Sequence, residues 1–501
     1  MADLSSQSMV TEYETFCCRW ALDGWVITGS GHLRLARLLA DPAVDFHVSP
    51  YSCAFPQSKR VVTRVYSGLL QVRCRSVTDA TEGRVRTGGM LPMLPVDSAS
   101  LHAKLFLTED DSRTHFCNDS LPGPGGCDGA GLPTKATGSL NETIELLARN
   151  VYTAAFHRSG EYFFDLFMKG WFGRPDKPAE TAALWSAIAV LRAQTAALGS
   201  GPITPQVAVL VDDASWAYLP LLGGAANNFG FNYALGEGQE ADFSTLGAPV
   251  SYYLVSDILS PSFPSDQLRL LIFTNAFALS DALRSAVSRL QGGERTLVWW
   301  YAPGILALEN STADAARISA LVGIAGITRG AGAASLSTRW SENCSYGNAT
   351  IEGLPPWHAD PWFYLDEHAA SAAASVEVLG RYVDGGAASL VRQSFASHTA
   401  VFSGAPGMPM EVMRALAKTA GVQLYVDAGD DVVDGRGSCL MVHAGATRHD
   451  ERTVRLPHSV ASVAMLSPLT SEAVSVPCAQ PCTSFQTPPL APGASRLFCF
   501  T

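Results

Sequence analysis

The feature that most constrains the fold is a regular alternation of helix-type and strand-type segments in which polar residues follow the strands. In residues 1–203, apolar spacing predicts helices and apolar runs predict strands. The helices are expected at 31–39 and 140–156, and the strands at 44–51, 101–107 and 161–167. Alternating helices and strands are typical of a parallel sheet covered by helices.

The same alternation starts again near residue 204 and continues to about 422. Strands are predicted at 206–213, 251–257, 268–276 and 295–303, with helices at 280–291 and 410–421. The last helix is expected to end at Gly421, because glycine readily adopts the backbone conformation of a helix C-terminal cap. We therefore predict an open, doubly wound parallel sheet for 204–422.

The sequence pattern changes after residue 422. Short alternating runs separated by Pro and Gly predict strands at 422–427, 439–445, 453–457, 461–466 and 495–500. Residues 423–501 are thus expected to form a small antiparallel β-domain of the sandwich type. Residues 59–86 are rich in arginine and lack clear periodicity, so they are either an inserted loop or sequence foreign to the mature protein.

The composition of the chain excludes several classes of binding partner. A net charge of -11, without a basic stripe, argues against nucleic acid or an anionic membrane surface as partner. No segment is apolar enough to predict a membrane span. Cysteine and histidine spacings predict no metal site, and no motif predicts a cofactor. This balance of charged residues is compatible with a carbohydrate substrate but does not by itself predict one.

Two features predict the secretory pathway, or a lysosome-like compartment, with a leader that is not part of this chain. The chain has 11 cysteines, and its N-x-[ST] sequons are at Asn118, Asn141, Asn310, Asn343 and Asn348. Cys117/Cys127 and Cys478/Cys482 bracket short loops of the kind that disulfides close, although connectivity is open at the sequence level.

Several stretches, in this order, resemble the β-galactosidases of glycoside hydrolase family 42. They are SGHLRLARLLADPAVDFHVSPY, LHAKLFLTEDDSRTHF, GEYFFDLFMKGWFG, VAVLVDDASW, LLIFTNAFALSD, TLVWWYAPG and CLMVHAG. The resemblance implies an α/β chain with a partial (β/α)8 barrel at 1–203 (about strands 5–8). An amidotransferase-like, trimerisation-type domain at 204–422 and a small β-sandwich at 423–501 would follow. It also implies a carbohydrate substrate and a homotrimer.

Glycoside hydrolysis needs two carboxylic groups that flank the bond, and barrel enzymes carry them at the C-terminal ends of strands. Glu109 follows the predicted strand at 101–107, which the resemblance makes the seventh, so we predict Glu109 as the nucleophile. The alternative is that Glu109 belongs to a solvated acidic turn. Arg113 is expected either to steady the Glu109 carboxylate or to form a surface ion pair.

Other candidate substrate contacts follow neighbouring strands. Asp165 comes at the end of a predicted strand, and Trp171 follows it; a carboxylate beside an aromatic ring suits a sugar. The alternative for Trp171 is packing against a helix. Tyr51 is a weaker candidate for the substrate rim, and His115 is expected to be an ordinary loop histidine.

The resemblance places the general acid/base on a fourth strand, usually in an Asn-Glu pair. Glu12 and Glu14 are the only glutamates before the strand at 44–51, and neither follows an apolar strand. We therefore expect the front of the barrel and the acid/base to lie upstream. Because no cysteine lies between Cys127 and Cys344, the middle domain is not expected to catalyse amidotransfer.

The sequence thus predicts a retaining, β-galactosidase-like glycoside hydrolase that is incomplete in this chain. The alternative is a non-catalytic secreted glycoprotein, derived from a hydrolase, that binds carbohydrate or serves assembly.

Overall fold

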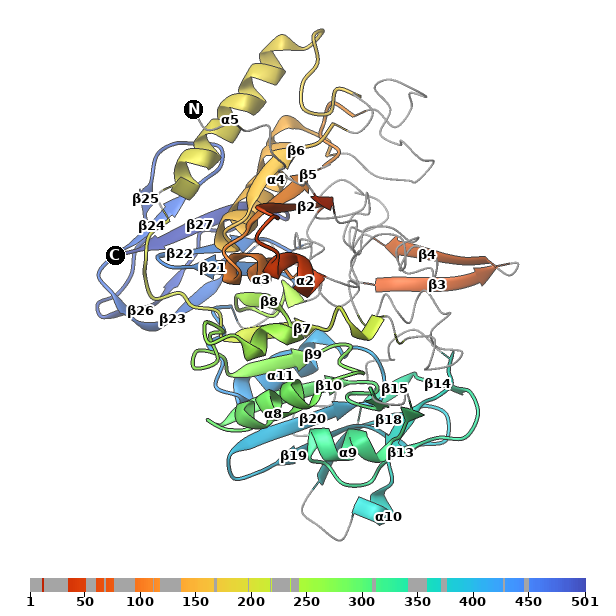
Figure 1. Cartoon of the computed structure of the whole chain (residues 1–501). Helices are drawn as coiled ribbons and strands as arrows, with labels where there is room; N and C mark the ends of the chain where they lie inside the picture. Colours follow the sequence, from red (N-terminus) through yellow and green to blue (C-terminus); the bar gives the residue numbers. More distant parts are fainter. Residues whose placement is uncertain are drawn as a thin grey trace.

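In the computed structural model, three main sheets of four or more strands follow one another along the described parts of the chain (Figure 1). It describes residues 11–12, 35–50, 60–66, 69–75, 95–110, 112–117, 137–165, 169–196, 198–216, 218, 235, 243–308, 312–340, 358–370, 376–426, 429–445 and 450–501. Among these residues, no helix has both the length and the apolar character that crossing a membrane requires.

The first sheet has four parallel strands in the order β1-β2-β5-β6. Their bounds are β1 (Thr11–Glu12), β2 (Phe46–Pro50), β5 (Leu105–Asp110) and β6 (Gly160–Phe163). The accompanying helices are α2 (Leu35–Ala40), α3 (Val96–Leu101), α4 (Leu140–Phe156) and α5 (Pro178–Ala196). Helix α4 has the predicted bounds, and it begins where the Ser139 side chain accepts a hydrogen bond from the backbone N–H of Glu142.

One predicted strand is displaced. The apolar run at 101–107 was expected to be a single strand, but Leu101 ends α3 and the strand begins at Leu105. The N–H of Lys104 bonds to the carbonyl of Ala99, and Ala103 adopts a positive φ of 56°, which closes the helix. Because of this shift, Glu109 lies within β5 near its C-terminal end rather than after it.

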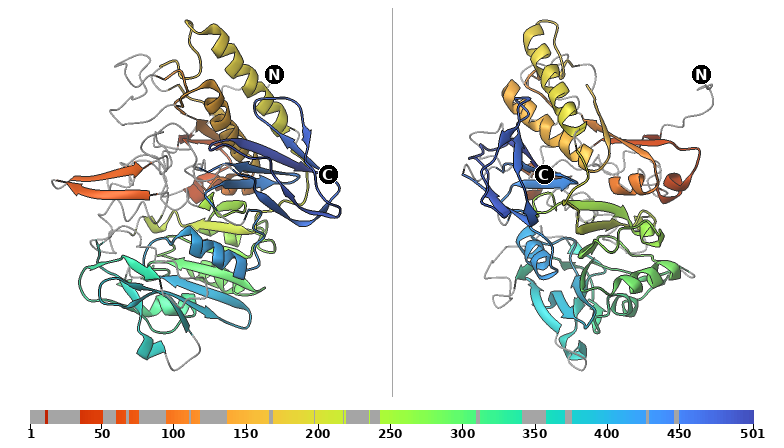
Figure 2. Two further views of the ribbon diagram at one scale, coloured as in Figure 1. Left: turned by 180° about the vertical axis from the view of Figure 1, so that it is seen from behind. Right: turned by 90° about the vertical axis from the view of Figure 1, so that its left-hand side faces the viewer.

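The arginine-rich segment contains more order than a loop. Residues within it form an antiparallel hairpin of β3 (Arg60–Tyr66) and β4 (Leu69–Arg75), which projects from the body in Figures 1 and 2. The expectation of a loop is therefore wrong for these residues. Strand β3 contains three valines and a threonine, and β-branched residues favour extended backbone.

The second sheet has a parallel half in the order β8-β7-β9-β10-β20. These strands are β7 (Val207–Val211), β8 (Val250–Leu254), β9 (Leu270–Phe273), β10 (Arg295–Trp300) and β20 (His398–Ser403). The helices of this region are η4 (Val255–Leu259), α8 (Asp281–Leu290), α9 (Ala316–Val322), α10 (Glu367–Ala370) and α11 (Met410–Thr419). After α11, Gly421 has φ 73°, as a glycine at a helix end requires.

The other half of this sheet is antiparallel, so the prediction of a purely parallel sheet is only partly correct. Its strands are β13 (Ile327–Arg329), β15 (Thr338–Trp340), β17 (Phe363–Leu365), β18 (Val376–Tyr382) and β19 (Ala388–Ser394). The connections β18–β19 and β19–β20 are too short for the crossover that parallel neighbours need. Two small ribbons complete the region: β11 (Leu306–Ala307) with β12 (Thr312–Ala313), and β14 (Ala334–Ser335) with β16 (His358–Ala359).

The third sheet is antiparallel, as predicted, in the order β21-β22-β27-β24-β25, and a two-stranded β23-β26 sheet accompanies it. The strands are β21 (Val432–Arg436), β22 (Cys439–His443), β23 (Thr453–Val460), β24 (Val463–Leu466), β25 (Val474–Ser475), β26 (Cys482–Gln486) and β27 (Ser495–Phe500). The strand expected at 422–427 is absent from described residues 422–426, where the N–H of Tyr425 bonds to the carbonyl of Gly247 instead.

Disulfides connect parts of this region. Cys478 is bonded to Cys482, which confirms that prediction, and Cys439 on β22 is bonded to Cys499 on β27, a pair that sequence spacing did not indicate. Cys117 is also disulfide-bonded, while Cys127 lies outside the described residues.

Helix α4 packs between the first and third sheets, as the views of Figure 2 show. Its Leu147 and Tyr152 are fully buried in a cluster that also contains Met441 of β22 and Leu497 of β27. Glu145 of α4 accepts hydrogen bonds from the backbone N–H of Ser495 and from the Arg496 guanidinium. The residues that follow β5 are thus held by a helix that is itself fixed on both sides.

Candidate active site

The candidate nucleophile lies where three parallel strands end side by side. In the register of the sheet, Glu109 of β5 is opposite Pro50 of β2 and Tyr162 of β6. Paired residues of neighbouring strands point to the same face, and the Tyr162 hydroxyl donates a hydrogen bond to the Glu109 carboxylate. Glu109 is 8% exposed, so it does not belong to a solvated turn, the alternative considered from the sequence.

Tyr162 is the partner that sequence reasoning missed. It lies in the predicted strand at 161–167, but only the pairing of β5 with β6 places it opposite Glu109. In the predicted strand Tyr162 lies near the N-terminal end, so nothing in the sequence indicated that it would lie beside Glu109. A hydroxyl that donates to a carboxylate stabilises the ionised form and fixes its orientation.

Arg113 and Trp171 lie against each other. The Arg113 guanidinium carbon is 4.2 Å from the centroid of the Trp171 ring, and the Thr114 hydroxyl donates to the Trp171 carbonyl. Arg113 is 3% exposed and Trp171 is 0% exposed. This burial favours the packing role of Trp171 over contact with a sugar. The predicted contact between Arg113 and Glu109 stays a prediction.

Asp165 organises a turn just after β6. Its two carboxylate oxygens accept hydrogen bonds from the backbone N–H groups of Lys169 and Gly170, each at 2.7 Å. Gly170 has φ 81°, a conformation that favours glycine. The structure thus gives Asp165 a local structural task, and its predicted contact with substrate stays a prediction. Tyr51 lies outside the described residues.

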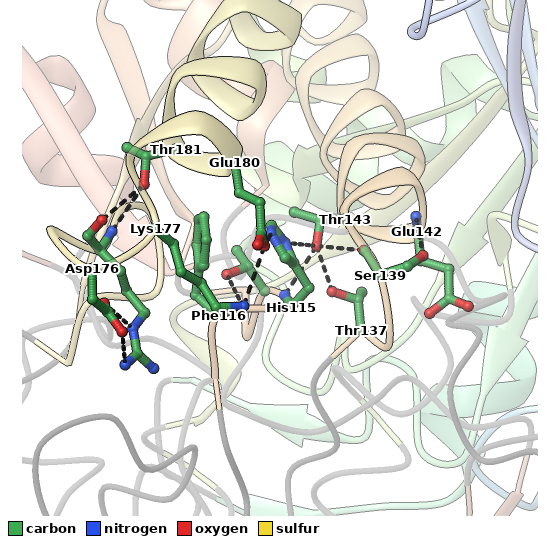
Figure 3. A network of polar contacts seen from close by, with 12 residues as sticks. His115, Phe116, Thr137, Ser139, Glu142, Thr143, Asp176, Lys177, Glu180 and Thr181 are labelled. Atoms are coloured by element: carbon green, nitrogen blue, oxygen red, sulfur yellow. Dashed lines mark hydrogen bonds and ion pairs between the residues drawn. The ribbon is translucent and has the colours of Figure 1, made fainter.

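His115 belongs to a polar network that joins the ends of α4 and α5 (Figure 3). Its Nδ1 is 2.9 Å from the Thr143 hydroxyl, and its Nε2 is 3.3 Å from the Glu180 carboxylate. Burial lowers the pKa of His115; the charge of Glu180 opposes this shift, and the charge of Lys177 adds to it. His115 therefore anchors the segment after β5 to two helices, a more specific role than the loop residue we expected.

A second polar cluster joins all three regions of the chain. His157, which follows α4, lies 2.9 Å from Asp97 of α3 and 3.5 Å from Asp434 of β21. Asp97 also accepts hydrogen bonds from the N–H of Tyr252 on β8 and from Arg436. Burial would lower the pKa of His157, but the Asp97 and Asp434 carboxylates raise it to about 10. The cluster therefore holds a buried imidazolium between two carboxylates.

Among the residues that the structure describes, no group of three or more His, Cys, Asp or Glu side chains could hold a metal ion.

Solved structures with a similar fold include β-galactosidases. The enzyme from the haloarchaeon Halorubrum lacusprofundi matches with a TM-score of 0.53 and 15% identity, over 96% of this chain and 67% of that one. The enzyme from Rahnella sp. R3 matches at 0.51 and 16%, over 82% of this chain and 57% of that one. A GH42 β-galactosidase from G. stearothermophilus matches at 0.51 and 13%, over 80% and 55%.

The chain therefore spans little more than half of the length of two of these enzymes. No protein-family model matches it, and no curated protein matches its sequence. The predicted resemblance to the GH42 β-galactosidases is confirmed in the fold: this is a divergent α/β chain with parallel-rich sheets like those of these enzymes.

Proposed function

We propose that the protein is a retaining glycoside hydrolase of the β-galactosidase type and that Glu109 is its nucleophile. The observation that carries this proposal is the buried Glu109 carboxylate at the C-terminal end of a parallel strand, oriented by the Tyr162 hydroxyl. In a retaining hydrolase, such a carboxylate attacks the anomeric carbon and forms a covalent bond to it. The bond from that carbon to the leaving oxygen breaks, and its electron pair stays on the oxygen.

The finer assignment of the regions is part of the same proposal. We assign the four parallel strands and their helices to the rear of a (β/α)8 barrel, with β5 carrying the nucleophile. The second sheet and its helices would form the amidotransferase-like domain through which a homotrimer assembles. The third sheet, together with the β23-β26 sheet, would form the small β-sandwich. The substrate would be a carbohydrate with a terminal galactoside.

The experiment is covalent trapping with 2,4-dinitrophenyl 2-deoxy-2-fluoro-β-D-galactoside. Dinitrophenolate leaves without protonation, so the reaction tests the nucleophile independently of the acid/base residue. We expect an increase in intact mass of one fluorogalactosyl group per chain, which peptide mapping places on Glu109. A chain that gains no mass, or that carries the sugar on another residue, would contradict the proposal. The first result would favour a non-catalytic carbohydrate-binding or assembly glycoprotein.

Tyr162→Phe should slow this trapping about 10–100-fold. The substitution removes one hydrogen bond to a charged acceptor, which contributes about 1.5–3 kcal/mol. The rate of adduct formation measures the effect, and Tyr364→Phe on β17 serves as the matched control. Equal rates in both variants would show that Tyr162 does not orient Glu109.

We also propose that the protein passes through the secretory pathway. Two disulfides among the described residues, Cys439–Cys499 and Cys478–Cys482, support this proposal because such bonds persist in oxidising compartments. The sequon residue Asn141 is exposed in the first turn of α4, where a glycan would meet solvent.

A further inference from the structure

A pair of carboxyl groups lies behind the candidate nucleophile, on the opposite face of strands β5 and β6. Successive residues of a strand point to opposite faces, so Asp110 and Glu161 face away from Glu109 and Tyr162. Thr108 is opposite Glu161 in the register, and Asp110 follows two residues later on the same face. The Asp110 and Glu161 carboxyl groups are therefore diagonal neighbours, close enough to interact directly.

Asp110 has donors to satisfy it. It is 0% exposed and accepts hydrogen bonds from the Asn150 side-chain amide and from the backbone N–H of Ser112, both at 2.8 Å. The oxygen of the same Asn150 amide accepts from the Arg149 guanidinium, so the amide orientation is fixed and its N–H points at Asp110. These hydrogen bonds compensate the Asp110 carboxylate for the water that it loses on burial.

Glu161 has no such donors. Both of its carboxyl oxygens are buried and receive no hydrogen bond from the described residues. The charged groups that face it are Asp110 on β5 and Arg149 on α4. Burial raises the pKa of Glu161 well above its ordinary value, the negative charge of Asp110 adds to this rise, and Arg149 opposes it. A buried carboxyl group beside a carboxylate avoids both the cost of burying a second charge and the repulsion between two negative charges when it stays protonated. Its proton then forms a hydrogen bond to the carboxylate.

We propose that Glu161 and Asp110 share a single proton and that this pair is a positioning device for Glu109, joining β5 to β6 directly behind the Glu109–Tyr162 hydrogen bond. Glu161 precedes Tyr162 in the chain, and Asp110 follows Glu109, so the shared proton and the tyrosine hydroxyl connect the same two strand ends from opposite faces. The positioning role rests on the proposed function, whereas the shared proton does not.

The shared proton is tested by thermal unfolding of the full chain and of Glu161→Gln at about pH 5 and about pH 8. The unfolded chain releases the Glu161 proton above its ordinary pKa of 4.5, but the folded chain retains it. The wild type therefore loses stability as pH rises, while glutamine has no proton to lose. Relative to the wild type, the melting temperature of Glu161→Gln should rise by on the order of 1 °C for each pH unit. Glu472→Gln, at an exposed site, should show a constant offset, and a constant offset for Glu161→Gln would overturn the proposal.

The positioning role is tested by the trapping rate at Glu109. Glu161→Ala removes the one donor that would link β6 to Asp110 and should slow adduct formation at least about 10-fold, whereas Glu161→Gln keeps a donor there and should restore the rate to within about 3-fold. Equal rates in wild type, Glu161→Ala and Glu161→Gln would overturn it. If the wild type forms no adduct, the proposed function fails, while the unfolding experiment still decides whether the proton is shared.

Discussion

Replacing Glu109 by glutamine should abolish the fluorogalactosyl adduct and lower the rate of dinitrophenolate release from the dinitrophenyl β-galactoside, a step that needs no acid catalyst, by on the order of 10⁴-fold or more. An uncharged amide is a poor nucleophile for the anomeric carbon, yet it has nearly the shape of the carboxylate and can still accept a hydrogen bond from Tyr162. Because Glu109 makes this contact at a strand end, the free energy of unfolding should change by only about 1 kcal/mol. Intact-mass measurements and denaturant unfolding check the two statements.

Azide provides the decisive control for this assignment. Glu109→Ala removes the carboxylate and leaves space beside the anomeric carbon, which the small azide anion can enter. We expect added azide to restore cleavage of the dinitrophenyl galactoside and to yield an α-galactosyl azide, because azide attacks from the side that the carboxylate occupied. If azide has no effect, or if Glu109→Gln retains the turnover of the wild type, another residue must carry the reaction.

Replacing His157 by alanine should lower the free energy of unfolding by about 3–5 kcal/mol. The substitution removes the cation that lies between Asp97 and Asp434, and Asp97 is completely buried within the fold. Burial alone would raise the pKa of Asp97, but the charge and the hydrogen bond of His157 lower it, with a smaller contribution from Arg436. Loss of the imidazolium therefore leaves a carboxylate that has lost both water and its main partner.

The pH dependence of this effect has a defined sign. The pKa of His157 rises from 6.5 to about 10 on folding, so its contribution is fully present below pH 6.5 and is lost as the pH rises through about 10. Denaturant unfolding at several pH values should show the difference between wild type and His157→Ala shrinking across this window. His458→Ala, at an exposed site on β23, should change stability by about 0.5 kcal/mol or less. A difference that is the same at all pH values would mean that His157 carries no charge in the fold.

The elements that the sequence predicted best are those with strong local signals. Helix α4 has the predicted bounds because its apolar stripe, its Ser139 cap and its length are all written within residues 139–156. Four of the five parallel strands of the second region, β7 to β10, were likewise predicted from their apolar runs, whereas β20 was not. Glu109 was placed correctly at a strand end, although β5 proved to start at Leu105.

The predictions of secondary structure and strand direction were wrong where residues distant in the sequence decide the local structure. Leu101 looks like the start of a strand, but it packs against the core of the second sheet as the end of α3. Residues 422–426 have a strand-like pattern, yet their backbone bonds to Gly247, and no neighbouring strand pairs with them. The antiparallel half of the second sheet follows from short connections whose direction no apolar period reveals.

The sequence by itself thus determined the α/β alternation, the change to antiparallel strands and the acid at the end of β5, because periodicity and strand ends are local properties. Only the tertiary structure decided what that acid faces. Tyr162 is 53 residues from Glu109 along the chain, and it becomes a partner because β6 pairs with β5 in one register. The same pairing brings Glu161 beside Asp110 on the other face. Hydrogen bonds and protons are shared between neighbours in space, and neighbours in space are fixed by packing rather than by spacing along the chain.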